Sequence, residues 1–206
     1  MGQYYTPILK SKKEGLGLMG FSAHQYDNGL KLMEHSYIGN KFTETIVKFM
    51  IEEGGKFRVA WVGDYAEDYV AREEIPNPLY ENEEYKKLYK EFIDYEKELE
   101  DPAYMKPDPI KPMENSSQLV FINHSKKEYI DMNHYVDDNK SDDWGYRIHP
   151  LPLLTAIGNG YGGGDYHKED KLVGYWACDE IEVVDWIKDN NIKKDYKEIR
   201  PIFNED

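Results

Sequence analysis

Cysteine is almost absent from this chain, because Cys178 is the single one among 206 residues. One thiol excludes an internal disulfide and is typical of proteins from a reducing compartment. Cys178 lies in an apolar stretch before an acidic residue and has no basic neighbour. We therefore expect it to be a buried small hydrophobic residue rather than a nucleophile.

Long apolar runs are missing as well. No stretch approaches the roughly 18 apolar residues that a membrane-spanning helix needs. The first residues, Met1-Gly2-Gln3-Tyr4-Tyr5, have neither the basic flank nor the apolar core of a signal peptide. We expect a soluble cytoplasmic protein without a membrane partner.

Basic residues are outnumbered: 26 Lys and Arg stand against 40 Asp and Glu, which gives a formal net charge of −14. Such a charge repels phosphate backbones, so direct binding to nucleic acid is not expected. Two interpretations remain open. The charge serves solubility, or an acidic surface approaches the basic groove of a nucleic-acid-binding protein.

Tyrosine is what the chain has in abundance, with 18 residues against seven phenylalanines. Hydrophobic residues make up 40% of the sequence, which is enough for a folded core. Tyrosine suits half-buried sheet faces and contact surfaces, because it buries a ring and keeps a hydroxyl group for a partner.

The first part of the chain alternates extended and helical patterns. Asn40 is a plausible N-cap, and Gly54-Gly55 a stop, for a helix over 41–53. Pro7 places the first strand at an edge or a bulge. We expect strands at 3–10, 21–26 and 57–62, whereas 30–37 is too short to classify.

The longest helix is expected at 82–100, where six apolar or aromatic residues share one stripe and charged residues fill nearly all the other positions. The stripe consists of Tyr85, Leu88, Tyr89, Phe92, Tyr95 and Leu99. Asp101-Pro102 ends the helix, and four prolines make 101–115 an extended linker. The stripe is either core, which we favour, or an interaction surface.

After the linker the first pattern returns. Strand-like 118–123 matches 3–10, Ser125-Lys126-Lys127-Glu128 matches 11–14, and 157–159 matches 38–40. Trp176 and Asp179 repeat Trp61 and Asp64 at the same separation (176 − 61 and 179 − 64 are both 115). Matches in order at nearly constant spacing favour an internal duplication.

The expected fold class is therefore α+β, with two related small α/β units and an inserted amphipathic helix. The boundaries are 1–75 for the first repeat, 76–115 for the tyrosine-rich helix and proline-rich linker, and 116–206 for the second repeat with its tail. In the second repeat we expect a further strand at 171–176, a short helix around 185–190, and a final extended piece.

The second repeat differs from the first in a glycine-rich loop at 158–166, which has five glycines among its first seven residues. It lacks the Gly-Lys-Ser/Thr of a P-loop and the strand and helix that flank a dinucleotide motif. The alternatives are a long connection whose glycines satisfy turn geometry, and a flap over a pocket. As a flap it would bind a ligand through Asn159, Tyr161, Gly162, Gly163, Asp165 and Tyr166, with the two tyrosine rings as stacking faces.

Histidine and aspartate gather in the second repeat, and imidazole near a carboxylate is a common hydrolytic pair. The candidates are His124, His149, Asp165 and Asp179, but no spacing among them is diagnostic of an enzyme family. Trp61-Asp64 and Trp176-Asp179 suggest either that each Asp caps a turn or that both line one pseudo-symmetric cleft. No metal ligand set and no cofactor motif is expected.

Five stretches of the sequence resemble a family of bacterial and phage proteins for which no catalytic residues are assigned. These stretches are MGQYY at the start, GLKLMEH at 29–35, NHSKKEY at 123–129, LPLLTAIGNGYGGGDY at 151–166 and GYWACDEIEV at 174–183. The resemblance covers most of the chain outside the tyrosine-rich helix and the linker. It implies membership but no activity.

Two functions remain for this sequence. The favoured one is a non-enzymatic acidic binding protein, such as a phage or mobile-element counter-defence protein, that binds a host protein through a basic groove or holds a nucleotide-like ligand. The alternative is a small hydrolase or nucleotide-modifying enzyme that uses the histidines and aspartates of the second repeat.

Overall fold

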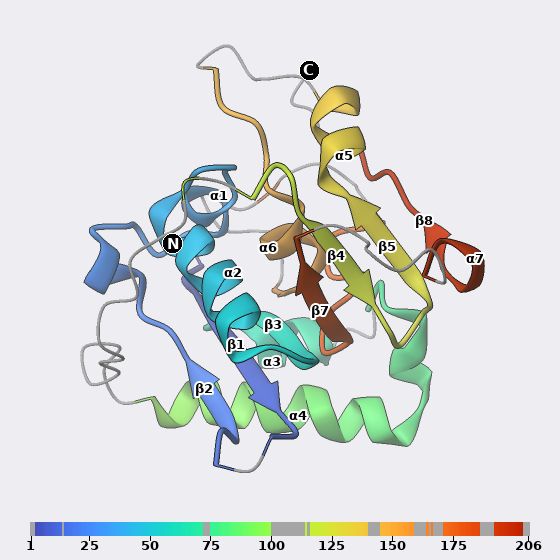
Figure 1. Cartoon of the computed structure of the whole chain (residues 1–206). Helices are drawn as coiled ribbons and strands as arrows, with labels where there is room; N and C mark the ends of the chain where they lie inside the picture. Colours follow the sequence, from blue (N-terminus) through green and yellow to red (C-terminus); the bar gives the residue numbers. More distant parts are fainter. Residues whose placement is uncertain are drawn as a thin grey trace.

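The computed structural model shows an α+β fold in which helices cover both faces of one mixed eight-stranded sheet (Figure 1). The structure describes residues 3–13, 15–71, 75–99, 114, 116–139, 145–158, 164, 166, 171–185 and 192–203. The strands are β1 (Tyr5–Ser11), β2 (Leu18–Gly20), β3 (Phe57–Gly63), β4 (Val120–Asn123), β5 (Glu128–Asp131), β6 (Ala156–Ile157), β7 (Glu180–Val184) and β8 (Lys197–Glu198). The helices are η1 (Ala23–Tyr26), α1 (Leu32–His35), α2 (Lys41–Glu53), α3 (Ala66–Val70), η2 (Pro78–Glu81), α4 (Glu83–Glu98), α5 (Met132–Asp138), α6 (Pro150–Leu154) and α7 (Ile192–Asp195).

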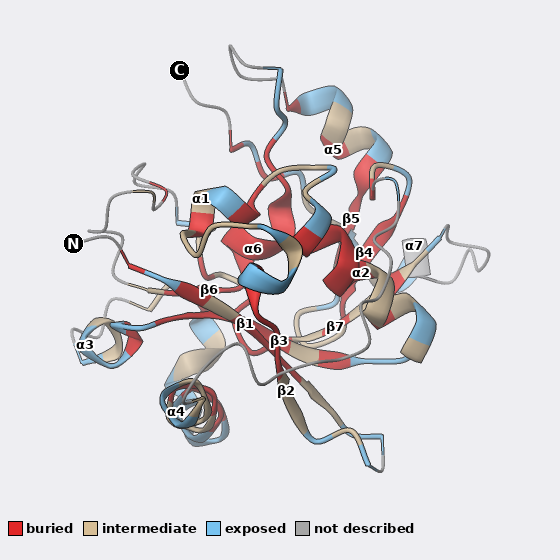
Figure 2. Cartoon of the chain, turned by 90° about the vertical axis from the view of Figure 1, so that its left-hand side faces the viewer, coloured by how far each residue is buried: buried red, intermediate tan, exposed pale blue. Residues whose placement is uncertain are grey.

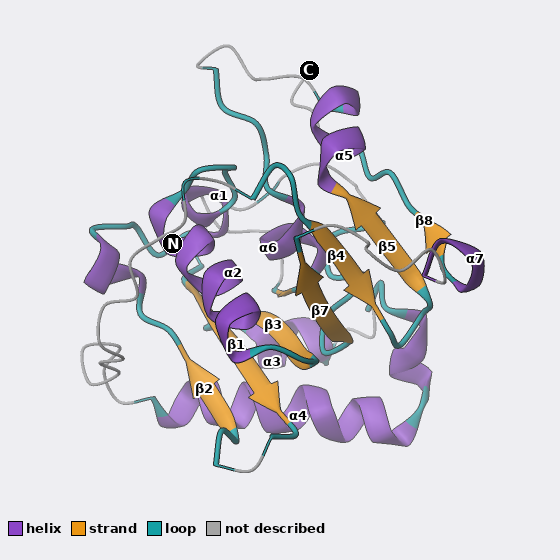
Figure 3. Ribbon diagram, in the orientation of Figure 1, coloured by secondary structure: helices purple, strands orange, loops and turns teal. Residues whose placement is uncertain are grey.

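The strand order is β2-β1-β3-β7-β4-β5-β8, with β6 beside β3 (Figure 3). From β2 to β5 every neighbouring pair is antiparallel. One side of the sheet therefore contains the hairpin β1–β2, and β3 pairs with the inner strand of this hairpin. The other side contains the hairpin β4–β5, and β7 pairs with its inner strand. The order is mirrored about the β3–β7 pair, and β8 adds in parallel at the outer side of β5.

Pro7 shows how sequence controls the first hairpin. Pro7 lies opposite Trp61 of β3, and its carbonyl oxygen accepts a hydrogen bond from the amide of Phe21, on the β2 side. Its missing N–H therefore also faces that side, just beyond the three residues that β2 pairs with β1. Pro7 is therefore at an edge on its β2 side, as predicted, because β2 does not reach it. The strand β1 as a whole is not an edge strand, since it lies between β2 and β3.

Helix α2 begins and ends where the sequence predicts. The Asn40 side chain accepts hydrogen bonds from the amides of Phe42 and Thr43, which have no partner inside the helix. Gly54 follows the last helical residue with a φ of 67°, a left-handed value that glycine adopts without a Cβ penalty.

Helix α4 confirms the predicted stripe as core. Of the predicted residues, Tyr85, Leu88, Tyr89 and Phe92 are buried against one face of β1 and β3, and Tyr95 is partly buried there. Ile93, which was not predicted, is buried beside them. Figure 2 shows α4 on one side of the strands, with α1, α2 and α6 on the other. Leu99 comes after the helix and is only half-buried, so the inward face ends earlier than the sequence indicates.

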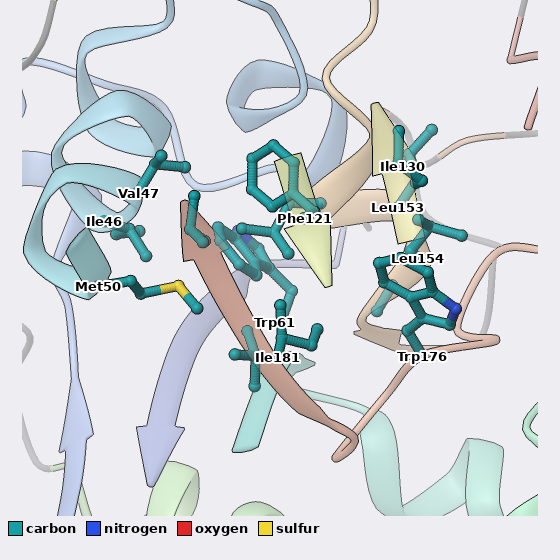
Figure 4. Packing of buried hydrophobic residues seen from close by; sticks show 14 of the residues in the cluster. Ile46, Val47, Met50, Trp61, Phe121, Ile130, Leu153, Leu154, Trp176 and Ile181 are labelled. Carbon is teal, nitrogen blue, oxygen red and sulfur yellow. The ribbon is translucent and has the colours of Figure 1, made fainter. Parts of the chain in front are cut away.

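The opposite face of the sheet carries the larger core. Side chains of α2 and α6 pack there on Trp61 of β3, Phe121 of β4 and Ile181 of β7. Figure 4 shows Trp61 and Trp176 in separate parts of this cluster. Both rings are fully buried.

Two predicted strands are wrong. Residues 171–178 form consecutive turns instead of a strand over 171–176, because backbone bonds such as Tyr175 N to Leu172 O and Ala177 N to Gly174 O close locally. Residues 21–26 end in the 3-10 helix η1, and the extended piece precedes them as β2. The apolar composition of both segments reflects burial, which turns can provide as well as strands.

The tryptophan match of the duplication is wrong as a structural equivalence. Trp61 is a central residue of β3 between β1 and β6, whereas Trp176 lies in the turns before β7. Both halves begin with a hairpin, continue with helices and contain a later strand that pairs with the first strand of that hairpin, but in the second half β6 comes before that strand. The short helix expected around 185–190 and most of the linker at 101–115 lie outside the described residues.

None of the helices in the described ranges is both long and apolar enough to cross a membrane.

Candidate functional site

The histidines and aspartate of the second repeat do not converge on one pocket. His124 bonds to Glu182 and Tyr196 on one face of the sheet. His149 is buried at the start of α6, and Asp179 lies beside β3 within a separate polar network. Asp165, the fourth candidate, lies outside the described residues. The prediction that these residues form one hydrolytic site is therefore wrong for His124, His149 and Asp179, the three that the structure describes.

Asp179 is the centre of a buried hydrogen-bond network. Its Oδ1 accepts from the Asn77 amide at 3.1 Å and the Tyr85 hydroxyl at 3.0 Å. Its Oδ2 accepts from the Asn123 amide at 2.6 Å and from the ammonium group of Lys126. Four donors from three separate segments thus satisfy one carboxylate that has no exposed surface.

The surroundings of the Asp179 carboxylate shift the pKa values of its partners. Burial and then the negative charge of Asp179 raise the pKa of Tyr85 to about 12. Burial lowers the pKa of Lys126, and the attraction of Asp179 acts in the opposite direction. Only 6% of the Lys126 side chain is exposed, and its ammonium group lies 4.8 Å from the centre of the Tyr175 ring. The network is closed to solvent and holds the fold together.

Asp179 and Asp64 do not line one cleft, although the sequence offers that alternative. Asp64 is exposed at the end of β3 and accepts a hydrogen bond from the Tyr4 amide. Trp176, which the sequence pairs with Asp179 in the second repeat, donates its indole N–H to Glu128 at 3.0 Å. One aspartate faces water and the other is sealed, so the pseudo-symmetric cleft is wrong.

His149 is a structural residue. Its Nδ1 accepts the Leu151 amide at 3.2 Å, so Nε2 carries the proton and donates to the Ser116 oxygen at 2.8 Å. Ser116 in turn donates to Glu44 at 3.1 Å. In a serine hydrolase the proton runs from serine to histidine, and the carboxylate holds the histidine. Here the direction is reversed, and burial lowers the pKa of His149 to about 3.

The glycine-rich loop is anchored at both of its described ends. A Cβ on Gly158 would collide with the Tyr5 hydroxyl, so this glycine permits close approach of another element. Gly164 has a φ of +91° and its carbonyl accepts the Met33 amide at 3.0 Å.

Tyr166 corrects part of the flap hypothesis. It is buried and packs edge-on against Phe203, with ring centres 5.8 Å apart, so it offers no stacking face to a ligand. The other loop residues proposed for binding, Asn159, Tyr161, Gly162 and Gly163, lie outside the described residues.

An open hollow of about 570 Å³ is the strongest candidate binding site in the described structure. Its walls come from η1 and the following turn, from the segment between α1 and α2, and from Tyr146 of the second half. The lining residues are Tyr26, Asp27, Asn28, Gly29, Glu34, Tyr37, Ile38, Gly39, Asn40, Lys41 and Tyr146.

Backbone hydrogen bonds hold the segment between α1 and α2 against the segment that follows Tyr146. The Ile38 amide donates to the Arg147 carbonyl at 2.9 Å, and Tyr37 forms a bridge with Ile148. The rings of Tyr37 and Tyr146 consequently lie with centres 5.0 Å apart at a tilt of 48°. Asn40 and Asn28, both in the lining, are also joined: the side-chain oxygen of Asn40 accepts a 2.9 Å hydrogen bond from the Asn28 side-chain amide.

The chemistry of the hollow combines negative charge with aromatic faces. Asp27 and Glu34 are exposed carboxylates, and Tyr146 is 56% exposed. Lys41 is the one cation among the lining residues that the structure describes. A positively charged planar or ammonium group matches this combination, because carboxylates attract it and tyrosine rings favour cations on their faces. The sequence alone does not indicate this site, because Tyr146 joins it from more than a hundred residues beyond Tyr37.

Among the described residues, no group of three or more His, Cys, Asp or Glu side chains is arranged to hold a metal ion.

Comparison with known proteins returns no matching family model, no matching curated protein and no matching solved structure.

Proposed function

We propose that this chain is an acidic binding protein that accepts a cationic side chain of a partner protein in the hollow between Asp27, Glu34, Tyr37 and Tyr146. The partner is a host protein with a basic groove. The net charge of −14 attracts such a surface over long range, and the hollow provides the local contact. The observation that carries the proposal is the pairing of exposed carboxylates with two adjacent tyrosine rings.

An arginine side chain suits this hollow best. Its guanidinium group is planar, donates to carboxylates in pairs and stacks on aromatic rings. Asp27 and Glu34 supply the acceptors, and the exposed ring of Tyr146 supplies a face. Tyrosine and arginine are also enriched among the residues that contribute most to protein interfaces.

The nucleotide-like ligand, the other partner expected from the sequence, is less compatible with this hollow. Its phosphate groups would meet Asp27 and Glu34, and among the described residues of the lining only Lys41 is a cation that could offset them. We keep a nucleotide as a competing ligand in the test below.

We propose further that the two halves descend from one duplicated unit, with α4 and its linker inserted between them. The mirrored strand order supports this. The resemblance to bacterial and phage proteins supports a counter-defence role against a host protein, and such a role fits an acidic surface.

The binding proposal is tested with an arginine-rich peptide, a lysine-rich peptide of equal length, and ATP, measured by fluorescence anisotropy or calorimetry. Asp27→Asn keeps the shape and the left-handed backbone of residue 27 (φ 52°), and Tyr146→Ala removes an exposed ring. We expect the double variant to bind the arginine peptide about tenfold more weakly, a change of about 1.4 kcal/mol.

Asp68→Asn is the matched control, because Asp68 is exposed on α3 and is not part of the hollow. Asp68→Asn removes one negative charge, as the double variant does, and should change the affinity for the arginine peptide less than about twofold. Equal losses in both variants would mean that only total charge attracts the peptide. Tighter binding of ATP than of either peptide would replace the cationic ligand with a nucleotide.

A further inference from the structure

A second constellation is centred on His124, which directly follows Asn123, one of the donors to the buried Asp179 carboxylate. His124 follows β4, Glu182 is on β7, and Tyr196 follows α7 (Figure 1). The His124 Nε2 atom lies 2.8 Å from a Glu182 carboxylate oxygen, and its Nδ1 atom lies 2.8 Å from the Tyr196 hydroxyl. One imidazole thus connects a carboxylate with a phenol.

The carboxylate fixes the direction of these bonds. An ionised carboxylate only accepts hydrogen bonds, so the neutral imidazole carries its proton on Nε2 and points it at Glu182. The Nδ1 lone pair then accepts the hydroxyl proton of Tyr196. The hydrogen bond from His124 lowers the pKa of Glu182, which keeps this carboxylate ionised. A base that is oriented by a carboxylate and bonded to a hydroxyl is the arrangement that activates a nucleophile.

The surroundings hold the three groups in place without sealing them. The exposed fraction is 12% for the His124 side chain and 29% for that of Glu182, and Tyr196 is half-buried. The rings of His124 and Tyr196 meet edge to face, with centres 5.6 Å apart. Tyr196 packs beside an apolar cluster of Val120, Ile122 and Tyr129.

We propose that Tyr196 is a nucleophilic residue that takes an acyl group from an uncharged carboxylic ester, with His124 as its general base. The Tyr196 oxygen attacks the ester carbonyl while its proton moves to His124 Nδ1. The bond to the alcohol breaks, and the leaving alkoxide takes that proton. Water then gives a proton to His124 and attacks the acyl-tyrosine, and the phenolate leaves and recovers the proton.

The substrate class follows from charge and shape. The Glu182 carboxylate disfavours anionic substrates such as phosphate esters, and Lys56 is the cation that acts on it at longer range. The apolar cluster beside Tyr196 offers a surface to an apolar acyl group. This activity is independent of the proposed binding of a cationic partner.

His134 provides an internal comparison. Its Nδ1 lies 2.6 Å from a Glu198 oxygen, and the neighbour on that side is Arg200 rather than a tyrosine. The nearby hydroxyl of Tyr129 bonds to Glu198. Among the described contacts none joins the His134 imidazole to a tyrosine hydroxyl, so this pair should not support the reaction.

The experiment uses 4-nitrophenyl acetate with the full chain, read as release of nitrophenolate, and peptide mapping by mass spectrometry after an acid quench. We expect acetyl on Tyr196 in the unmodified protein. Tyr196→Phe and His124→Gln should each lower the second-order rate constant about tenfold or more, because a general base contributes at least that much. His134→Gln and His24→Gln, which remove other accessible imidazoles, should leave it within about twofold.

Mapping of the unmodified protein keeps the test valid even if a variant fails to fold. Acetyl spread equally over Tyr196 and the exposed Tyr4 and Tyr146 would overturn the proposal, as would an unchanged rate in Tyr196→Phe. A rate that falls equally in His134→Gln would show only the intrinsic reactivity of surface imidazole.

Discussion

Lys126 places its ammonium group on the carboxylate of Asp179, and both side chains are almost completely removed from water. The two residues come from different segments, the β4–β5 turn and the start of β7. The same ammonium group also donates to the Asn77 side-chain oxygen at 2.9 Å, in the segment before η2. The pair therefore joins the second hairpin, the central strands and the approach to α4.

Breaking this pair should strongly destabilise the protein. Lys126→Met leaves a buried carboxylate without its counter-charge, and Asp179→Asn leaves a buried ammonium. We expect each to lower the free energy of unfolding by about 3 to 5 kcal/mol, measured by urea denaturation. Lys90→Met is the control, because its 2.8 Å pair with Asp94 is exposed and its loss should change the free energy of unfolding far less. A loss in Lys126→Met as small as in the control would make the network dispensable.

Phe92 tests whether α4 is part of the core. It has no exposed surface and packs between α4 and the sheet. Phe92→Ala should cost about 3 to 5 kcal/mol of unfolding free energy, because it removes buried apolar surface and leaves a cavity. Leu99→Ala, at the half-buried end of the same stripe, should cost clearly less. Similar small costs for both would make the stripe an interaction surface instead.

Glu96 should make stability depend on pH. Burial, and then the nearby charge of Asp64, raise the pKa of Glu96 from 4.5 to about 7. Above pH 4.5 the unfolded chain has lost this proton while the folded chain keeps it until about pH 7, so the stability falls as pH rises through this window.

Glu96→Gln removes this dependence, because an amide does not titrate. At pH 8 the variant should gain about 1 kcal/mol of unfolding free energy, after allowance for the partial exposure of Glu96. Its melting temperature should therefore lie about 2 to 4 °C above that of the unmodified protein. At pH 4.5 it should show no such gain. Glu98→Gln, which changes an exposed glutamate on the same helix, should show no such difference between the two pH values. A gain of equal size at both pH values would exclude protonation of Glu96 as the cause.

The glycine-rich loop can be divided into scaffold and flap by substitution. Gly158→Ala should lower the melting temperature, because its methyl group meets the Tyr5 side chain. For a flap, replacing Gly162 and Gly163 with Ala should impair binding of the peptide probes more than folding. For a turn, the same double variant should melt lower while the surviving folded molecules bind normally. Melting curves and binding isotherms on the same samples decide between these outcomes.

The sequence alone determined the elements whose signals are local. The cap at Asn40, the stop at Gly54 and the stripe around Phe92 depend on contacts within a few residues or on one helical period, so their pattern is visible without a fold. Burial of Cys178 followed in the same way from its apolar neighbours, and the structure adds that burial raises the pKa of its thiol well above the usual value.

Only the tertiary structure decided which polar residues meet. Trp176 and Asp179 matched Trp61 and Asp64 in the sequence, yet their surroundings differ because strand pairing sets the environment of a side chain from far along the chain. The hollow requires Tyr146 to lie beside Tyr37, and the His124 constellation requires Glu182 and Tyr196 to arrive from separate elements. Composition and periodicity carry no information on such distant pairs, because a side chain's partner depends on the register and packing of the whole sheet.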